Sequence, residues 1–514
     1  MRRLPTLLLL LMVATSATAA DWFVRVLGGT AAQCTGHTDQ NYDGGAHGTA
    51  CAYANPQDAL TNMNCATPDH VYIRDGTYVG NYTVKPICQA TDTNTRLIIE
   101  GNASDPNAVT LDGSGGTIAL YSVGGTGSYG NRSKFITIKN IRIIAGTEEG
   151  IQFNGTHEGI DFDNLRIDVP NATCCAHPPP ISAGIYHGPD QGCWGCKITN
   201  TVITGTGTTT IKGLTGTDAQ GINFTPLGSG CTGCTQPPTS YFQNNTITKM
   251  LGSCFGGNYS NSYIENNRCK TTVSHGDDGG FQLYNSANAV IRFNLFEDIR
   301  CDETDNYGVF FSIRSTNETD ATKVANAFIY NNTIVGSSAN TDHSLGEKYF
   351  YMDDIIHPSS EKTYFVNNIV IRNFGVDLST YGSFSGFADK HAALIADCGT
   401  TLPEIGHNIV DDIGWRDNGT RTEFMGLWMD VDEVDCNIDP NTMGNLIGTD
   451  PSLEATNWTP DNSADLPCGA GDTTVVAPDG GTSKSWIGYA QGACLVGGPG
   501  SIIKGVTVTG GTVH

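Results

Sequence analysis

The stretch from Phe255 to Ile299 reads FGGNYSNSYIENNRCKTTVSHGDDGGFQLYNSANAVIRFNLFEDI and holds one pattern in two copies. In the second copy a short apolar strand follows glycines at 280–283, and a polar turn leads to a second strand, 290–294, that ends in asparagine. The first copy spans 255–267. A unit of this kind cannot bury its own apolar face, so it stacks on its neighbours. We therefore expect the copies to be successive coils of a β-solenoid.

The asparagine turn recurs along the chain with apolar residues on both sides of it. Alternation of apolar and polar residues is typical of strands with one buried face. Asparagine suits the corner because it tolerates a left-handed backbone and its amide can bond the coils above and below. Further units begin at Ile138, Phe162, Ile198, Gln243, Glu265, Tyr330, Val366 and His407, at spacings of roughly 22 to 45 residues. This recurrence disfavours the alternative, a β-sandwich with asparagine turns.

A second set of strands begins after glycine and lies half a coil earlier. If these strands stack, successive residues point to opposite faces. The residues that would face inward are Ile151, Ile185, Ile222, Phe281 and Val309. The residues that would form one outward polar column are Gln152, Tyr186, Asn223 and Gln282. We predict that this column contacts substrate.

This pattern resembles the right-handed parallel β-helix proteins, the pectate-lyase-like superfold, over most of the chain. The end of the chain, with Asp450-Pro451 and then Asp479-Gly480-Gly481, resembles the tail that closes the solenoid in secreted β-helix repeat proteins. The resemblance implies an all-β, right-handed parallel β-helix with N- and C-terminal caps. It implies no particular activity, since this fold hosts lyases, hydrolases, epimerases and adhesive proteins.

The 514 residues divide by pattern into four parts. We expect a signal peptide over 1–20, an N-terminal cap with the first coils over 21–95, the β-helix over 96–415, and C-terminal coils with a cap over 416–514. The leading apolar run is too short to span a bilayer, and no later run is long enough. The chain is therefore expected to be exported, to the extracellular space, the cell surface or a periplasm.

Seventeen cysteines fit an oxidising compartment, where most of them pair as disulfides. The pairs suggested by proximity in the sequence are Cys34 with Cys51, Cys65 with Cys88, Cys398 with Cys436, and Cys468 with Cys494. The CxxC motifs at 193–196 and 231–234 could bind zinc. In an exported chain we expect them instead to form disulfides that staple two long loops.

The net charge of −24 and the pI of about 4.7 argue against a nucleic-acid partner. An anionic polysaccharide would also be repelled, unless cations or a local basic patch bind it. Acidic residues precede several glycine-led strands, as Glu148 and Glu149 precede Gly150. On stacked coils such acids would lie about 4.8 Å apart along one sheet edge. That spacing suits Ca²⁺, for which we predict Asp218 and Asp305 as ligands.

The insert His275-Gly276-Asp277-Asp278-Gly279 is the sharpest candidate for catalysis. Crowded carboxylates raise one another's pKa, which keeps one of them protonated as an acid. His275 could orient or relay a proton, and Asp277 and Asp278 could act as the acid and base of glycoside hydrolysis. The structural alternative is a tight Asp-Gly turn with a solvated histidine.

A lyase would instead need a base beside the uronate that it cleaves. Arg292 is expected to point outward beside Glu265 and Tyr330 of neighbouring coils, where we predict a substrate contact. The alternative for Arg292 is a surface ion pair with Glu265. The other candidates for the base are Lys270, Arg314, Tyr284 and His187.

Together these patterns predict a secreted, monomeric, carbohydrate-active protein without a transmembrane segment. It would hold an extended polysaccharide on the outward column and cleave it by lyase or hydrolase chemistry. The alternative is a non-catalytic binding or adhesion scaffold, in which the acids are scattered solvent-facing groups.

Overall fold

In the computed structural model, the described residues are 19–46, 48–64, 67–84, 96–123, 133–169, 182–187, 193–205, 219–224, 239–250, 252–270, 273–274, 280–301, 307–309, 311–314, 326–336, 346–348, 350–352, 363–371, 394–396, 404–406, 408–411, 416–417, 422–423, 427–429, 446–447 and 473–483. The predicted signal peptide, apart from its last two residues, lies outside them. So do five of the predicted site residues: Asp218, His275, Asp277, Asp278 and Asp305.

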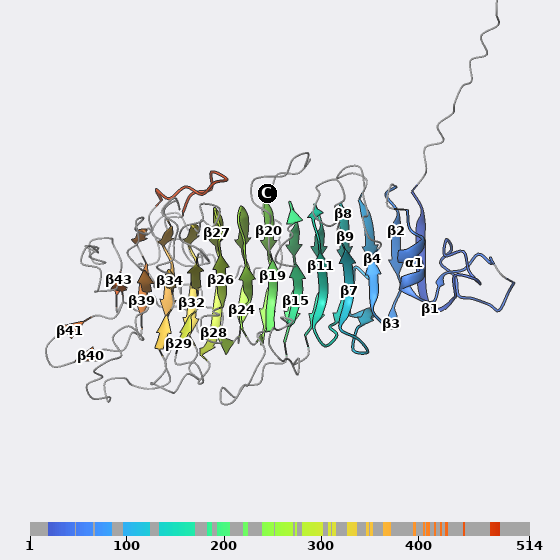
Figure 1. Ribbon diagram of the computed structural model, residues 1–514, viewed down its shortest axis with the longest axis horizontal. Coiled ribbons are helices and arrows are strands. Elements are labelled where there is room, and N and C mark those ends of the chain that lie inside the picture. Colours follow the sequence, from blue (N-terminus) through green and yellow to red (C-terminus); the bar gives the residue numbers. More distant parts are fainter. Residues whose placement is uncertain are drawn as a thin grey trace, which may run out of the picture.

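Strands of successive coils pair in parallel and build three long sheets along the molecule (Figure 1). Sheet 1 contains β1 (Asp21–Gly29), β2 (His70–Ile73), β5 (Leu97–Glu100), β9 (Ile136–Lys139), β13 (Asp161–Asp163), β17 (Lys197–Thr199), β20 (Ser240–Gln243), β23 (Ser262–Glu265), β27 (Ala289–Arg292), β31 (Ala327–Tyr330), β35 (Tyr364–Val366) and β38 (Glu404–Gly406). Sheet 2 contains β3 (Gly76–Val79), β6 (Val109–Asp112), β10 (Arg142–Ile144), β14 (Arg166–Asp168), β18 (Val202–Thr204), β21 (Thr246–Thr248), β24 (Arg268–Lys270), β28 (Leu295–Cys301), β32 (Thr333–Gly336), β36 (Ile369–Ile371), β39 (Ile409–Asp411) and β43 (Leu446–Ile447), with β25 (Val273–Ser274) paired to β28.

Sheet 3 contains β4 (Tyr82–Val84), β7 (Ile118–Val123), β11 (Glu149–Asn154), β15 (Ser182–His187), β19 (Ala219–Phe224), β22 (Phe255–Gly257), β26 (Phe281–Tyr284), β30 (Phe311–Arg314), β34 (Phe350–Met352), β37 (Leu394–Ala396) and β42 (Leu427–Met429). Small sheets join β8 (Ser133–Lys134), β12 (His157–Glu158) and β16 (Cys193–Trp194), β29 (Tyr307–Val309) and β33 (Gly346–Lys348), and β40 (Arg416–Asp417) and β41 (Thr422–Glu423). The prediction of an all-β, right-handed parallel β-helix is confirmed.

The core lies inside the coils, where the strands of all three sheets point their apolar residues. One inward column of sheet 1 consists of Ile138, Phe162, Ile198, Phe242, Ile264, Ile291, Ile329 and Phe365, each at most 3% exposed. The prediction for Val309 is wrong. Phe281 pairs with Phe311 of β30, whereas Val309 belongs to β29 and pairs with Lys348 of β33.

A ladder of buried asparagines runs along the corner between sheets 1 and 2. Its members are Asn245, Asn267, Asn294, Asn332, Asn368 and Asn408. Each Nδ2 up to Asn368 donates to the Oδ1 of the next asparagine at 2.9–3.2 Å. Each Nδ2 also donates to a carbonyl of the preceding coil at 2.8–3.1 Å. The left-handed backbone falls one residue earlier, with φ of 55–59° at Asn244, Asn266, Phe293, Asn331 and Asn367.

The N-terminal end is covered by α1 (Pro56–Asn62), which Figure 1 shows beside β1 and β2. Asn55 caps this helix by accepting a hydrogen bond from the Gln57 N–H, and proline occupies the first helical position, where no N–H is needed. The helix buries Ala59 and Leu60. A single turn of 3₁₀-helix, η1 (Pro106–Ala108), precedes β6.

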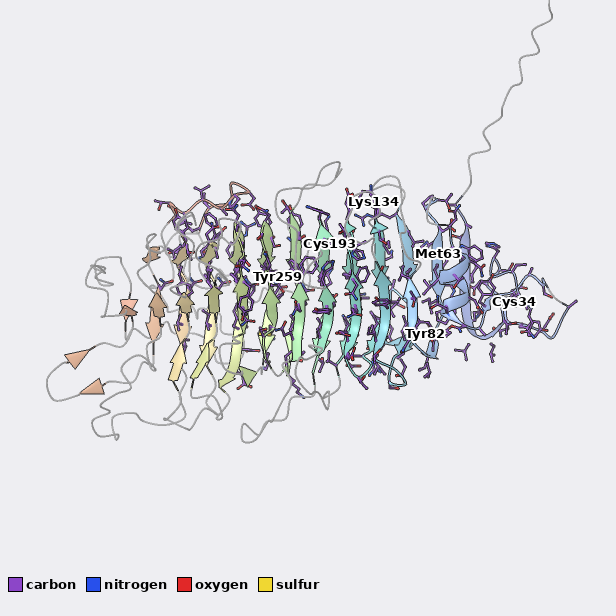
Figure 2. The ribbon with its side chains drawn as sticks, viewed as in Figure 1. Cys34, Met63, Tyr82, Lys134, Cys193 and Tyr259 are labelled. Carbon is purple, nitrogen blue, oxygen red and sulfur yellow. A yellow bond between two sulfur atoms is a disulfide. The ribbon has the colours of Figure 1, made fainter. Side chains whose placement is uncertain are left out.

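Six of the described cysteines form three disulfides, and Figure 2 labels one cysteine in each of two of them, Cys34 and Cys193. The predicted pair Cys34–Cys51 is confirmed, with Cα atoms 5.0 Å apart. Cys193 pairs with Cys196 of its own motif, so this motif does not staple two loops. A third disulfide, between Cys254 and Cys269 inside the coil, was not predicted. The other predicted pairs, and the motif at 231–234, lie outside the described residues.

The C-terminal segment Thr473–Ser483 packs against the outside of sheet 1 near β27, as the red trace of Figure 1 shows. The resemblance implied a tail that closes the end of the solenoid, but this part of it lies along the side of the stack. Among the described helices, none is long and apolar enough to cross a membrane.

Candidate functional site

The outward column predicted on the glycine-led strands is present on sheet 3. The strand register aligns Tyr121, Gln152, Tyr186, Asn223, Gly256 and Gln282 on successive coils. Their neighbours in the chain, such as Ile151 and Phe153, are in the core, so this column lies on the outer face. The four predicted residues therefore share one column, although Gly256 separates Asn223 from Gln282.

Amide and phenol groups line this outer face. Asn154 Nδ2 donates to the Tyr121 hydroxyl at 3.3 Å, and Gln282 Nε2 donates to the Tyr284 hydroxyl at 2.5 Å. At Gly256 the column has no side chain, and the amide of Gln220 fills the space. A Cβ at Gly256 would lie 2.5 Å from Gln220 Oε1. Gln220 therefore also lies on the outer face of sheet 3.

Glu149 shares a row with Gln220 at the edge of sheet 3 where the strands begin. The register pairs Glu149 with Ala183, and Ala183 with Gln220. The following glycine turns inward, since a Cβ at Gly150 would lie 2.7 Å from Cγ2 of the core residue Ile167. Because Ile151 also points inward, two consecutive residues face the core, and Glu149 falls on the same side as Gln152.

The carboxyl group of Glu149 is poorly solvated. It is 2% exposed, and its Oε2 has no hydrogen-bond partner among the described residues. Burial, and to a smaller extent the charge of the nearby Glu148, raise the pKa of Glu149 to about 8. At neutral pH the group is therefore mostly protonated, which is the state required of a general acid.

Two further polar side-chain atoms, on coils beyond that of Glu149, are buried without hydrogen-bond partners among the described residues. They are Gln220 Oε1, two strands along sheet 3 from Glu149, and Ser253 Oγ, just before β22 on the following coil. The Gly221 N–H donates to the Ser253 carbonyl at 3.0 Å, which fixes Ser253 beside Gln220's strand. Buried polar atoms are nearly always hydrogen-bonded in folded proteins, to protein, water or a ligand. This row can therefore accept hydrogen bonds from a molecule bound on the outer face.

Arg292 lies apart from this site, because β27 belongs to sheet 1. Its Nε donates to Glu265 Oε2 at 2.6 Å, its Nη1 to the Tyr330 hydroxyl at 2.8 Å, and its Nη2 to Asp479 Oδ2 at 2.8 Å. The predicted neighbours on adjacent coils are both present. The structure thus does not bring Arg292 together with Gln152, Tyr186, Asn223 and Gln282.

The candidate bases are spread over the molecule. His187 points inward, 2% exposed, with Nε2 3.3 Å from Nδ1 of the buried His157. Lys270 pairs with Glu297 on sheet 2 at 3.2 Å. Tyr284 and Arg314 share a register on sheet 3, beside the column. Among the described residues, no group of three histidine, cysteine or acidic side chains could hold a metal ion.

The sequence contained one signal for Glu149, the pair of acids in front of Gly150. Nothing in it showed which of these acids is buried. The roles predicted for His275, Asp277 and Asp278, and for Asp218 and Asp305 as Ca²⁺ ligands, remain predictions because these residues lie outside the described part of the chain.

No protein-family model and no curated protein matches this sequence. Among solved structures, the chain is similar to an alginate lyase from Paenibacillus sp. str. FPU-7, at 14% identity and a TM-score of 0.38, over 73% of this chain and 94% of that one. It is similar to the pectate lyase Pel9A at 11% identity and a TM-score of 0.46, over 92% and 96%. It is also similar to a GH136 lacto-N-biosidase from Eubacterium ramulus, at 10% identity and a TM-score of 0.41, over 84% of this chain and 68% of that one. At these values the likeness assigns no activity, and the fold rests on the chain's own strand pairing.

Proposed function

We propose that this protein is a secreted carbohydrate-active β-helix that binds an extended polysaccharide along the outer face of sheet 3 and cleaves it beside Glu149. The observation that carries the proposal is the buried Glu149 carboxyl at the strand-start edge of sheet 3, beside the column that holds Tyr121, Gln152, Tyr186 and Asn223. The coils present this column at intervals of about 4.8 Å, which suits a polymer lying along the axis.

The chemistry that Glu149 supports best is hydrolysis. A protonated carboxyl can donate its proton to the glycosidic oxygen as the bond breaks. A second carboxylate must then act as base or nucleophile, at a separation of about 5 to 9.5 Å. Asp277 and Asp278, with His275 as the orienting group, stay proposed as a separate acid–base pair, because the strand that they precede, β26, lies four strands along sheet 3 from β11. Asp218 and Asp305 stay proposed as Ca²⁺ ligands.

Tyr186 and Asn223 are proposed to bind sugar hydroxyls. Both are half-buried on the column next to the Glu149 row. A tyrosine ring adds apolar area on which a sugar ring can pack, and the asparagine amide can both donate and accept. The disulfides of the described residues are the support for an exported protein.

The proposal is tested by incubating the purified full chain with a panel of neutral and acidic polysaccharides. New reducing ends report any cleavage, and the ultraviolet absorbance of an unsaturated uronate reports lysis alone. We expect reducing ends without that absorbance, and a loss of about 10²-fold or more in Glu149→Gln. The matched control is Glu148→Gln, which changes the same functional group one residue away and should retain activity.

The two candidate functions separate in the same experiment. If Glu149→Gln cleaves as fast as the wild-type protein, Glu149 is not the acid. If a polysaccharide of the panel binds the protein but no new reducing ends form, the protein is the non-catalytic scaffold. The outer face of sheet 3 is then a binding surface only. Lysis by the wild-type protein would refute hydrolysis.

A further inference from the structure

The outer face of sheet 1 carries an aromatic row that is separate from the site on sheet 3. Its members, aligned by the strand register, are Tyr241, Tyr263, Val290, Phe328 and Tyr364. The Tyr241 and Tyr263 rings lie 5.5 Å apart at 18°, and the Phe328 and Tyr364 rings lie 5.2 Å apart at 16°. The row therefore consists of two pairs of nearly parallel, stacked rings, about one coil apart within each pair, with Val290 between the pairs.

Arg292 stands in the next column of the same face, at the centre of this row. Its guanidinium carbon lies 5.5 Å from the centre of the Tyr263 ring and 6.0 Å from that of Tyr330. Such cation–π contacts hold the guanidinium flat against the aromatic rings. Glu265 and Tyr330 take the Nε and Nη1 hydrogens, and these partners fix the direction in which the remaining donors point.

A carboxylate from a distant part of the chain occupies those donors. Asp479 Oδ2 lies 2.8 Å from Arg292 Nη2, and Oδ1 lies 3.4 Å from Nη1, so both oxygens face the guanidinium fork. Asp479 belongs to the segment Thr473–Ser483, which we call the strap. A planar guanidinium that presents paired N–H groups is the group best matched to a carboxylate.

The strap is a hairpin that closes on itself. The Ser483 N–H donates to the Val475 carbonyl at 2.9 Å, and the Ala477 N–H donates to the Gly481 carbonyl at 2.8 Å. Val475 and Ala477 pack on the aromatic row, while Val476 is 55% exposed. The Asp479 side chain is 31% exposed, so water competes for its ion pair and the pair stabilises the closed strap only slightly.

We propose that Arg292 and the aromatic row form a second saccharide-binding surface, specific for a sugar that carries a carboxylate, and that the strap covers it with Asp479 standing where the sugar carboxylate binds. The aromatic side chains would contact the apolar parts of the sugar rings, and Arg292 would take the carboxylate. When the sugar carboxylate replaces that of Asp479, the buried guanidinium of Arg292 still has a carboxylate partner. The cost of burying its charge is therefore offset with the strap closed and with the sugar bound.

This surface differs from the site on sheet 3 in the ligand that it selects. The described outer face of sheet 3 around Glu149 offers amides, phenols and a protonated acid, whereas sheet 1 offers a fixed cation. Because the strap must open first, the apparent affinity of the wild-type protein is its intrinsic affinity reduced by the open fraction. Weakening the strap should therefore tighten binding without any new contact.

The test is calorimetric titration of the full chain with an oligogalacturonate, with its fully methyl-esterified form as the neutral probe. Asp479→Asn removes the competing charge. Gly481→Ala keeps both ion-pair side chains but disturbs their closed arrangement, because a Cβ there would collide with Arg292 Nη1 and lie 2.9 Å from Asp479 Oδ1. We expect each variant to bind the acidic oligomer about tenfold tighter than wild type, and neither to change its affinity for the ester. The gain should persist in a Glu149→Gln background, which also prevents cleavage at sheet 3.

Arg292→Gln should abolish binding of the acidic oligomer to this surface, and circular dichroism would confirm that the variant is folded. The proposal is overturned if Asp479→Asn and Gly481→Ala bind the acidic oligomer no tighter than wild type. It is equally overturned if they bind the ester with the same gain, since the strap would then cover an aromatic surface with no role for the cation.

Discussion

The free energy of unfolding should depend on pH through Glu149, and the effect is large enough to measure. The pKa of this carboxyl is about 8 in the fold, against an ordinary value of 4.5 in the unfolded chain. Below pH 4.5 both states are protonated, and the group costs nothing. As pH rises, the unfolded state ionises first, so the fold loses stability until pH passes about 8, where both states have ionised.

The size of the loss follows from the two pKa values. They differ by about 3.5 pH units, and each unit is worth about 1.36 kcal/mol, so the full loss is on the order of 5 kcal/mol. Glu149→Gln keeps the shape of the side chain and cannot ionise. We therefore expect this variant to match the wild-type protein near pH 4.5 and to exceed its stability by several kcal/mol above pH 8.

The measurement is urea unfolding followed by circular dichroism across this pH range, for the wild-type protein, Glu149→Gln and Glu148→Gln. Glu148 is half-exposed and is the smaller cause of the raised pKa of Glu149, so its variant should keep most of the wild-type loss of stability, whereas Glu149→Gln removes it. The reasoning is refuted if the Glu149→Gln and wild-type curves run parallel, because the carboxyl would then be solvated in the fold and Glu149 would not be a protonated acid at neutral pH.

Three other perturbations have defined outcomes. Asn294→Ala leaves several buried hydrogen-bonding groups of the ladder without partners and should lower the free energy of unfolding by about 2–4 kcal/mol in urea titrations. The control Asn62→Ala, on the exposed side of α1, should lower it by under about 1 kcal/mol. Equal losses in the two variants would show that the ladder hydrogen bonds do not stabilise the fold. Burial lowers the pKa of His157 well below its ordinary 6.5, so the fold should keep its full stability above pH 6.5 and lose stability as pH falls below it. In thermal melts at decreasing pH, His157→Phe should reduce this fall of the melting temperature. An unchanged fall in the variant would show that other groups cause it. Replacing Cys254 and Cys269 together by serine opens a disulfide with a sequence separation of 15 and should cost about 3 kcal/mol in urea unfolding; a reducing agent should then have no further effect at this pair, and a wild-type-like midpoint would argue that the bond is not formed.

The fold could be predicted because its strongest signals are local and repeated. The asparagine turns recur on many successive coils, and from Asn245 to Asn408 the structure links each ladder asparagine to the next by a hydrogen bond. The sequence did not show that two adjacent residues have different roles at each turn. The first adopts the left-handed backbone, and the second forms the hydrogen bonds along the ladder. Phe293 takes the first position, so that position does not require asparagine.

Other features could not be predicted because they depend on contacts between distant segments. Val309 matched the glycine-led pattern as well as Phe311 does, and only the pairing with Phe281 distinguishes them. Arg292 and its two coil neighbours followed from the register, but Asp479 comes from 187 residues away in the chain. The burial of Glu149 likewise depends on what surrounds it in three dimensions, which no spacing of residues records.

The asparagine ladder fixes the distance between successive coils. The Thr201 N–H donates to Asn245 Oδ1. From Asn245 to Asn408 every step is set by the same pair of hydrogen bonds, from the backbone N–H and from Nδ2 to the next Oδ1, so the rise from coil to coil cannot vary freely. Equivalent positions on the outer faces of the sheets are therefore separated by the same rise. A polymer whose own repeat equals this interval meets equivalent groups at every coil, whereas one with a different repeat falls out of step after a few units. For a polymer bound as proposed, the length of its repeat would then matter as well as its chemistry.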